Sequence, residues 1–223
     1  MRYNDRVDYR KLARFLVFTA LVVGIIYGAL RYLLIKVWTV PDDDPALSAS
    51  ITPSLEGGDI VILLHAGNPG FSDLVRCTDP DEPRRWVIAR IVAEGGDSVE
   101  LSQGRLIVNG QPVRTESACS PSKFTVEDPS TGSPVELRCD MEDLGGSAHM
   151  RGTGRREGLA VDAPVKRTIQ PGFAFLVSDN RFYPFDSRTY GPVPIETCDA
   201  RIIFRIWGAS GFSDEERRFT WVD

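Results

Sequence analysis

An uncharged apolar stretch near the N-terminus constrains this chain more than any other feature. Residues 15–30 read FLVFTALVVGIIYGAL, and the apolar character resumes after Arg31 and continues to Trp38. At about 1.5 Å per helical residue, a segment of this length crosses a hydrocarbon core of about 30 Å. We therefore expect a transmembrane anchor over residues 15–38. We favour an uncleaved anchor over a cleaved secretory signal, because the apolar region is long and no small-residue cleavage site follows closely.

The charges on either side of this segment predict its orientation. Five of the seven Lys and Arg residues among the first forty precede Phe15, and positive charge favours the cytosolic side of a membrane. We expect residues 1–14 to form a cytosolic basic tail and the chain after Val40 to lie outside. The net charge of the whole chain is −5, which argues against nucleic acid as the main partner because phosphate binding needs a basic surface.

Beyond the anchor, short apolar runs separated by turn residues predict a mainly β fold of antiparallel strands. Strand-like runs recur without a convincing helical pattern, and Asn109-Gly110 is a hairpin turn signal. One stretch is rich in Ser, Pro and Gly with little periodicity, which predicts an irregular inserted subdomain. The expected parts are a spacer (39–45), a β core in two pieces (46–111 and 165–208), the insertion (112–164) and a polar tail (209–223).

All four cysteines lie in the part expected outside the cytosol, where disulfides persist. Cys119 and Cys139 bracket the insertion, which has little core of its own, so we expect these two to pair. The partners of Cys77 and Cys198 stay open at this point, and free buried thiols are the alternative. We expect no metal site, because the two histidines show no ligand spacing with the thiols.

Two runs of residues are candidates for chemistry. Residues 48–55 read SASITPSL, which places a serine before a proline-braced turn and a strand. Such a serine can be a well-presented nucleophile, but the pattern alone is more often only a turn. Residues 178–191 repeat Asp and Arg at short spacing. Charges of this kind are tolerated inside a protein as hydrogen-bonded pairs and can support a site, although in isolation the run reads as an exposed polar turn.

Together and in this order behind one anchor, these runs resemble the bacterial type I signal peptidases, serine endopeptidases that remove signal peptides. The family box Ser-Met-x-Pro-Thr-Leu corresponds to residues 50–55, and Gly-Asp-x-Val corresponds to residues 58–61. The late box is matched from Asp179 to Gly191, with Ser178 in place of its leading glycine. The resemblance implies a signal peptidase I-like β fold, a single-pass protein of the bacterial inner membrane, no cofactor, and signal-peptide-bearing exported proteins as partners.

By this resemblance Ser50 stands at the nucleophile and Ser48 at a side-chain donor to the oxyanion hole. In the family a buried neutral lysine takes the serine proton. Its box, Lys-Arg-Val-Val-Gly-x-Pro-Gly-Asp, aligns with residues 89–97 without a gap and places Ala89 at the base. Pro184 stands where the family has a serine that hydrogen-bonds this lysine. The supporting residues that the resemblance implies are Arg90, Asp179, Asn180, Arg181, Asp186, Ser187 and Arg188.

A methyl group accepts no proton, and the guanidinium of Arg90 stays charged. Among the four lysines Lys166 is the least unsuitable replacement base, and His65 fails because it follows the Gly-Asp box. Two hypotheses follow: a membrane-anchored endopeptidase with an incomplete Ser–Lys dyad, and a catalytically silent relative that binds extended signal-peptide or pilin-like segments by strand addition. A membrane protein that retains the fold alone is a third and weaker hypothesis.

Overall fold

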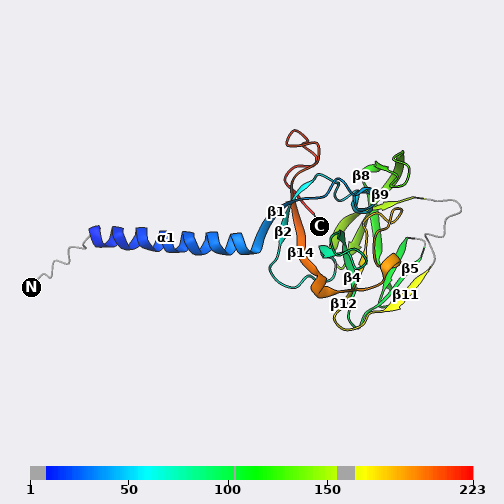
Figure 1. The fold of residues 1–223 in the computed structure, drawn as a ribbon, viewed down its shortest axis with the longest axis horizontal. Coiled ribbons are helices and arrows are strands. Elements are labelled where there is room, and N and C mark those ends of the chain that lie inside the picture. The colour runs from blue at the N-terminus through cyan, green and yellow to red at the C-terminus, as the bar shows by residue number, and fades with distance from the viewer. Residues whose placement is uncertain (1–8, 103, 155–163, 223) are drawn as a thin grey trace, which may run out of the picture.

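A single long helix precedes a β-rich domain in the computed structural model, which describes residues 9–102, 104–154 and 164–222. Helix α1 (Tyr9–Leu34) extends as a rod away from the domain (Figure 1). Its segment Tyr9–Ala29 is apolar, with no part of it buried against the protein. At about 1.5 Å per residue the helix is long enough to span a bilayer once.

The helix ends four residues before the expected end of the anchor at residue 38. Ile35–Thr39 instead forms strand β1, which pairs with strand β2 (Ile60–Leu64) in antiparallel register. The β-branched residues Ile35, Val37 and Thr39 favour extended backbone, and the pairing satisfies their peptide groups. Helix α1 therefore continues into the first sheet directly. The expected spacer (39–45) begins inside β1 at Thr39, and Val40, which follows, is buried in the core.

Within the described residues, the domain contains three antiparallel sheets. The largest contains, in spatial order, β1, β2, β14 (Cys198–Trp207), β3 (Leu74–Thr78), β4 (Trp86–Glu94), β12 (Phe173–Val177) and β13 (Val193–Pro194), with β15 (Thr220–Trp221) paired to β14. A four-stranded sheet contains β11 (Val165–Thr168), β5 (Ser98–Ser102), β6 (Arg105–Val108) and β7 (Gln111–Pro112). The short helices are α2 (Pro45–Ile51), α3 (Ser187–Tyr190) and the 3-10 turn η2 (Ile195–Thr197).

The insertion is more regular than its composition predicts. It forms the third sheet, in the order β10 (Ser147–Thr153), β9 (Pro134–Leu144) and β8 (Arg114–Glu127). Most β8 side chains are exposed. The alternation of apolar and polar residues that predicts a half-buried strand is therefore missing from the sequence there. A disulfide between Cys119 and Cys139 joins β8 to β9, the pairing that the bracketing of the insertion predicts. Part of the expected insertion, residues 155–163, lies outside the described residues.

Strand β4 lies at the centre of the core. Val87, Ala89 and Ile91 face one apolar cluster, which also contains residues of β3, β12 and β14. Ile88 faces another cluster, together with Leu47 and Ile51 of α2. Because side chains alternate along a strand, β4 packs against both layers.

A second disulfide and the C-terminal segment close the fold. Cys77 of β3 and Cys198 of β14 are directly opposite in the ladder and form a disulfide across a sequence separation of 121 residues. The segment expected as a polar tail instead returns to the domain. Its strand β15 adds to β14, and Val222 is buried in the same cluster as Val40.

Candidate active site

Helix α2 carries Ser48 and Ser50, the serines expected at the oxyanion hole and at the nucleophile position. Asp44 caps the helix by accepting the Leu47 N–H at 3.0 Å, and Pro45 suits its first turn. Ser50 is fully buried, and its hydroxyl donates to the Leu47 carbonyl at 2.8 Å. Within the described part of the chain, this hydroxyl makes no hydrogen bond to an ionisable side chain.

Asn180 attaches the late box to the backbone of α2. Its N–H donates to the Ser50 carbonyl at 2.9 Å, and its side-chain amide donates to the Ala49 carbonyl at 2.8 Å. Its side-chain oxygen accepts the N–H groups of Phe182 and Tyr183. All these groups are buried or partly buried, so the two boxes form one rigid unit although they are about 130 residues apart.

The other residues of the late box hold the end of β12. Asp186 caps α3 and accepts the Ser178 N–H at 2.8 Å, while Arg188 folds back onto its carboxylate at 2.7 Å. Burial by itself would raise the pKa of Asp186, but Arg188 and these hydrogen bonds outweigh burial and lower it. The Ser187 hydroxyl accepts the Leu176 N–H at 3.0 Å. These contacts fix the turn. The polar groups of Asp186, Ser187 and Arg188 named here are already engaged in these hydrogen bonds.

Ala89 and Arg90 project to opposite faces of β4. Ala89 is fully buried in an apolar cluster, against which Phe185 and Tyr190 also pack. Arg90 is 2% exposed and donates from Nε to Asp179 at 2.9 Å. The structure therefore surrounds position 89 with apolar groups, while the only charge beside it in sequence is directed to Asp179.

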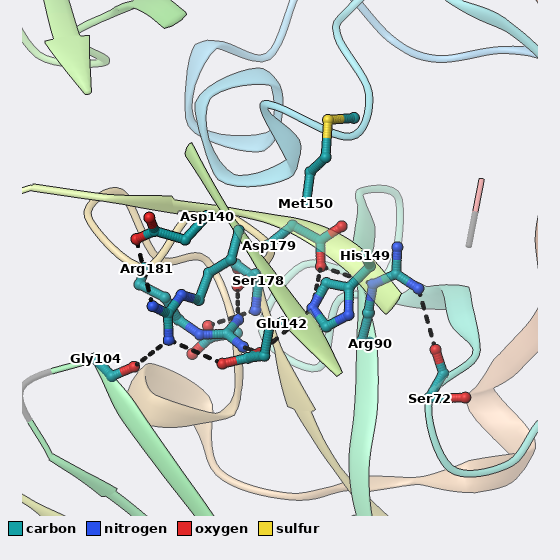
Figure 2. A network of polar contacts seen from close by, with 12 residues as sticks. Ser72, Arg90, Gly104, Asp140, Glu142, His149, Met150, Ser178, Asp179 and Arg181 are labelled. Atoms are coloured by element: carbon teal, nitrogen blue, oxygen red, sulfur yellow. Dashed lines mark hydrogen bonds and ion pairs between the residues drawn. The ribbon is translucent and has the colours of Figure 1, made fainter. Parts of the chain in front are cut away.

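A buried ionic cluster joins residues of the insertion to residues of the late box (Figure 2). Glu142 of β9 contacts Arg151 at 3.0 Å, pairs with Arg181, and lies 3.4 Å from Nε2 of His149. His149 Nε2 also lies 3.8 Å from Asp179, which links the cluster to Arg90. Burial would raise the pKa of Glu142, but the positive charges around it, led by Arg181, lower it to about 2.

This cluster was not predicted from the sequence. Its acidic centre and its histidine come from the insertion, whose composition predicted irregular structure. Burial lowers the pKa of His149 and keeps the imidazole neutral. The alternation of His149 and Arg151 along β10 was the available signal, because residues two apart in a strand share a face.

The candidate replacement bases lie elsewhere. Lys166 is on β11 of the four-stranded sheet, with its side chain 76% exposed and paired with Glu100. Lys123 is on β8, 61% exposed and paired with Glu136. His65 follows β2 and contacts the Asp199 carbonyl through Nδ1 at 2.8 Å. Both ammonium groups are exposed and paired with a carboxylate, so neither occupies the buried position that the family's base has.

Two cavities flank α2. One, of about 380 Å³, lies between residues 41–47 and 82–86, and contains the Arg85–Asp44 ion pair at 2.6 Å. The Arg85 guanidinium also stacks 4.0 Å from the centre of the Phe185 ring. The other cavity, of about 290 Å³, lies between α2 and the end of β8, and Ser48 is among its lining residues.

Comparison with known proteins identifies the class to which this fold and site belong. Residues 12–207 match the family model described as signal peptidase, peptidase S26, and the chain belongs to this family. It is 28% identical to the probable thylakoidal processing peptidase 2 of Arabidopsis thaliana over 88% of this chain and 44% of that protein. It is 26% identical to Signal peptidase I V of Bacillus subtilis over 54% of this chain and 56% of that protein. The chain thus spans about half the length of the curated relatives that it matches.

Proposed function

We propose that this chain is a membrane-anchored signal peptidase relative that binds signal-peptide segments of exported proteins beside Ser50 without cleaving them at an appreciable rate. In this assignment Ser50 occupies the nucleophile position and Ser48 the oxyanion position, while Ala89 leaves the position of the base empty. Arg90, Asp179, Asn180, Arg181, Asp186, Ser187 and Arg188 support the site. Neither a metal nor a cofactor takes part in this assignment.

The surroundings of Ala89 carry this proposal. A serine hydroxyl is a weak nucleophile until a base takes its proton. Position 89 presents a methyl group to an apolar cluster, and the Ser50 hydroxyl is bonded to a backbone carbonyl. Losing the base costs a serine hydrolase roughly 10⁴ to 10⁶ in turnover. Peptide binding does not need the base, since an extended segment can be held by main-chain hydrogen bonds and side-chain pockets.

Slow endopeptidase activity is the second candidate. It is favoured by the retention of Ser50 and Ser48 on one short helix, because an oxyanion donor and correct positioning supply catalysis even without a base. The two candidates share one binding site and differ only in rate, so the same experiment separates them.

That experiment combines binding and cleavage of a signal-peptide-bearing precursor by the full chain in lipid nanodiscs. We expect saturable binding that a scrambled signal sequence does not reproduce. We expect cleavage to be at least about 10³-fold slower than by a family member with a Ser–Lys dyad. Rapid cleavage that survives Lys166→Ala and disappears in Ser50→Ala would contradict the proposal, because an unidentified base would then serve Ser50. Absence of binding would contradict it as well.

The same proposal includes the cellular location and membrane orientation of the protein, which we infer from its N-terminal apolar helix. We propose a single-pass protein of the bacterial inner membrane with a cytosolic N-terminus, because basic residues crowd before Phe15. The two disulfides belong in an oxidising compartment, which agrees with an extracytoplasmic domain. Protease added to intact spheroplasts should therefore digest the domain. A protected domain, digested only after lysis, would show that the orientation is reversed.

A further inference from the structure

The Ser48 hydroxyl is held by a loop that lies after α2. Its oxygen accepts the N–H of Gly57 at 3.1 Å. A serine hydroxyl has one proton to donate, and an acceptor bond fixes the direction in which this proton can point. An oxyanion donor needs such a fixed direction before charge develops. The position of the Gly57 N–H therefore helps to set the direction in which the Ser48 hydroxyl can donate its proton.

Gly57 reaches this position only because it has no side chain. A Cβ on Gly57 would lie 2.9 Å from the Cα of Asp42, 3.0 Å from the Pro41 carbonyl and 3.2 Å from the Ser48 oxygen. The first two contacts are with backbone atoms, which cannot move aside cheaply. The absence of a side chain on Gly57 allows the loop to come this close to Ser48. Other contacts must stop the loop from moving away from Ser48.

Arg217 supplies such contacts from the C-terminal segment. One of its guanidinium nitrogens lies 2.6 Å from the Glu56 carboxylate, and the other lies 2.9 Å from the Asp59 carboxylate. Glu56 and Asp59 are the two ends of the loop that contains Gly57. The Asp59 carboxylate is fully buried and also accepts the Glu56 N–H at 3.0 Å. A planar guanidinium can join two carboxylates in a fixed fork geometry, which the rotatable donors of a compact ammonium do not reproduce.

We propose that Arg217 is a positioning residue for the Ser48 hydroxyl, acting through the loop 56–59 and the Gly57 N–H. The role of Ser48 toward a bound peptide rests on the function proposed above, whereas the positioning of the loop does not. Arg217 lies beyond the family-matched residues 12–207, so the C-terminal segment of this chain completes a site that the family boxes begin.

Asp59 keeps other partners when Arg217 is replaced. Arg205 lies 3.3 Å from its carboxylate, and the Ala209 N–H donates to it at 3.0 Å. Arg217→Met should therefore remove the link to Glu56 without leaving a buried charge alone. The neighbouring Arg218 offers a matched control, since it pairs with the exposed Glu215 and not with the loop.

The test begins with hydrogen exchange of the full chain in nanodiscs, followed in peptides that cover residues 54–60. We expect Arg217→Met to speed exchange there by about tenfold, and Arg218→Met to leave it unchanged. Should Arg217→Met fold poorly, Arg217→Lys serves instead, because a lysine keeps the charge but not the rigid fork that joins the two carboxylates, so exchange should still rise. Unchanged exchange in a folded Arg217 variant would overturn the proposal.

Binding of a signal-peptide segment, measured by fluorescence anisotropy, gives the second readout. We expect Arg217→Met and Ser48→Ala each to weaken binding by about threefold to tenfold, as for one lost hydrogen bond. The double variant should bind like Ser48→Ala, because the two residues act as one unit. Multiplied losses would show that Arg217 acts by another route. If the wild-type chain binds no peptide, the proposed function fails, while the exchange result still decides whether Arg217 positions the loop.

Discussion

The Ala89→Lys/Pro184→Ser double variant is expected to cleave a precursor at least about 100-fold faster than the wild-type chain, the lower end of what a general base contributes. Position 89 is fully buried among apolar side chains, which favours the neutral amine that a base requires. The Pro184→Ser change would add a hydroxyl next to Phe185, which packs on the same cluster. Steady-state cleavage of a labelled precursor measures the gain.

The single variants should gain much less than the pair. A lysine placed alone at position 89 lacks a partner that orients it, and Pro184→Ser alone supplies no base, so the effects should be strongly non-additive. Ala174→Lys is a matched control, because Ala174 is equally buried in the same cluster but has no place in the family's dyad. It should lower stability without raising cleavage. Equal gains from Ala174→Lys, or a gain that survives Ser50→Ala, would refute the assignment of position 89.

Glu142→Gln is expected to lower the free energy of unfolding by about 3–5 kcal/mol, as found when one partner of a buried ion pair is removed. Glu142 is 1% exposed and contacts both Arg151 and Arg181, and Arg181 is itself buried. The neutral amide would leave the Arg181 charge without a carboxylate in direct contact. Denaturant unfolding of the full chain, followed by tryptophan fluorescence, measures the loss. Glu136→Gln, on the same strand but in an exposed pair with Lys123, should cost less than about 1 kcal/mol.

The effect of Glu142→Gln should depend on pH. The folded protein lowers the pKa of Glu142 from 4.5 to about 2. A carboxylate with a lowered pKa stabilises the fold fully above its unfolded pKa, and this contribution is lost as the pH falls toward the folded value. The difference between wild type and Glu142→Gln should therefore be constant near neutral pH and shrink between pH 4.5 and about 2. A difference that stays constant through this range would show that lost packing, not lost charge, destabilises the variant.

The sequence alone was sufficient to predict the features that depend on residues close together in the chain. An apolar stretch predicts a membrane-spanning helix by its length, and short apolar runs between turn residues predict the β class. The boxes around Ser50, Ala89 and Asp179 identify the family, because their order and spacing are specific. Local pattern failed where a strand is exposed on both faces, as β8 is, since such a strand carries no alternation of polar and apolar residues.

Contacts between distant segments were decided only by the tertiary structure. Cys77 meets Cys198 because β3 and β14 become neighbours in one sheet, and no spacing rule predicts a partner 121 residues away. Glu142 and Arg181 also meet only in the folded chain, because one comes from the insertion and the other from a late turn. Lys166 was a candidate base in the sequence, but its strand belongs to another sheet and exposes it. Residue types thus determined which chemistry was available to this chain. The pairing of strands, driven by burial of apolar faces and satisfaction of backbone hydrogen bonds, determined which groups came together.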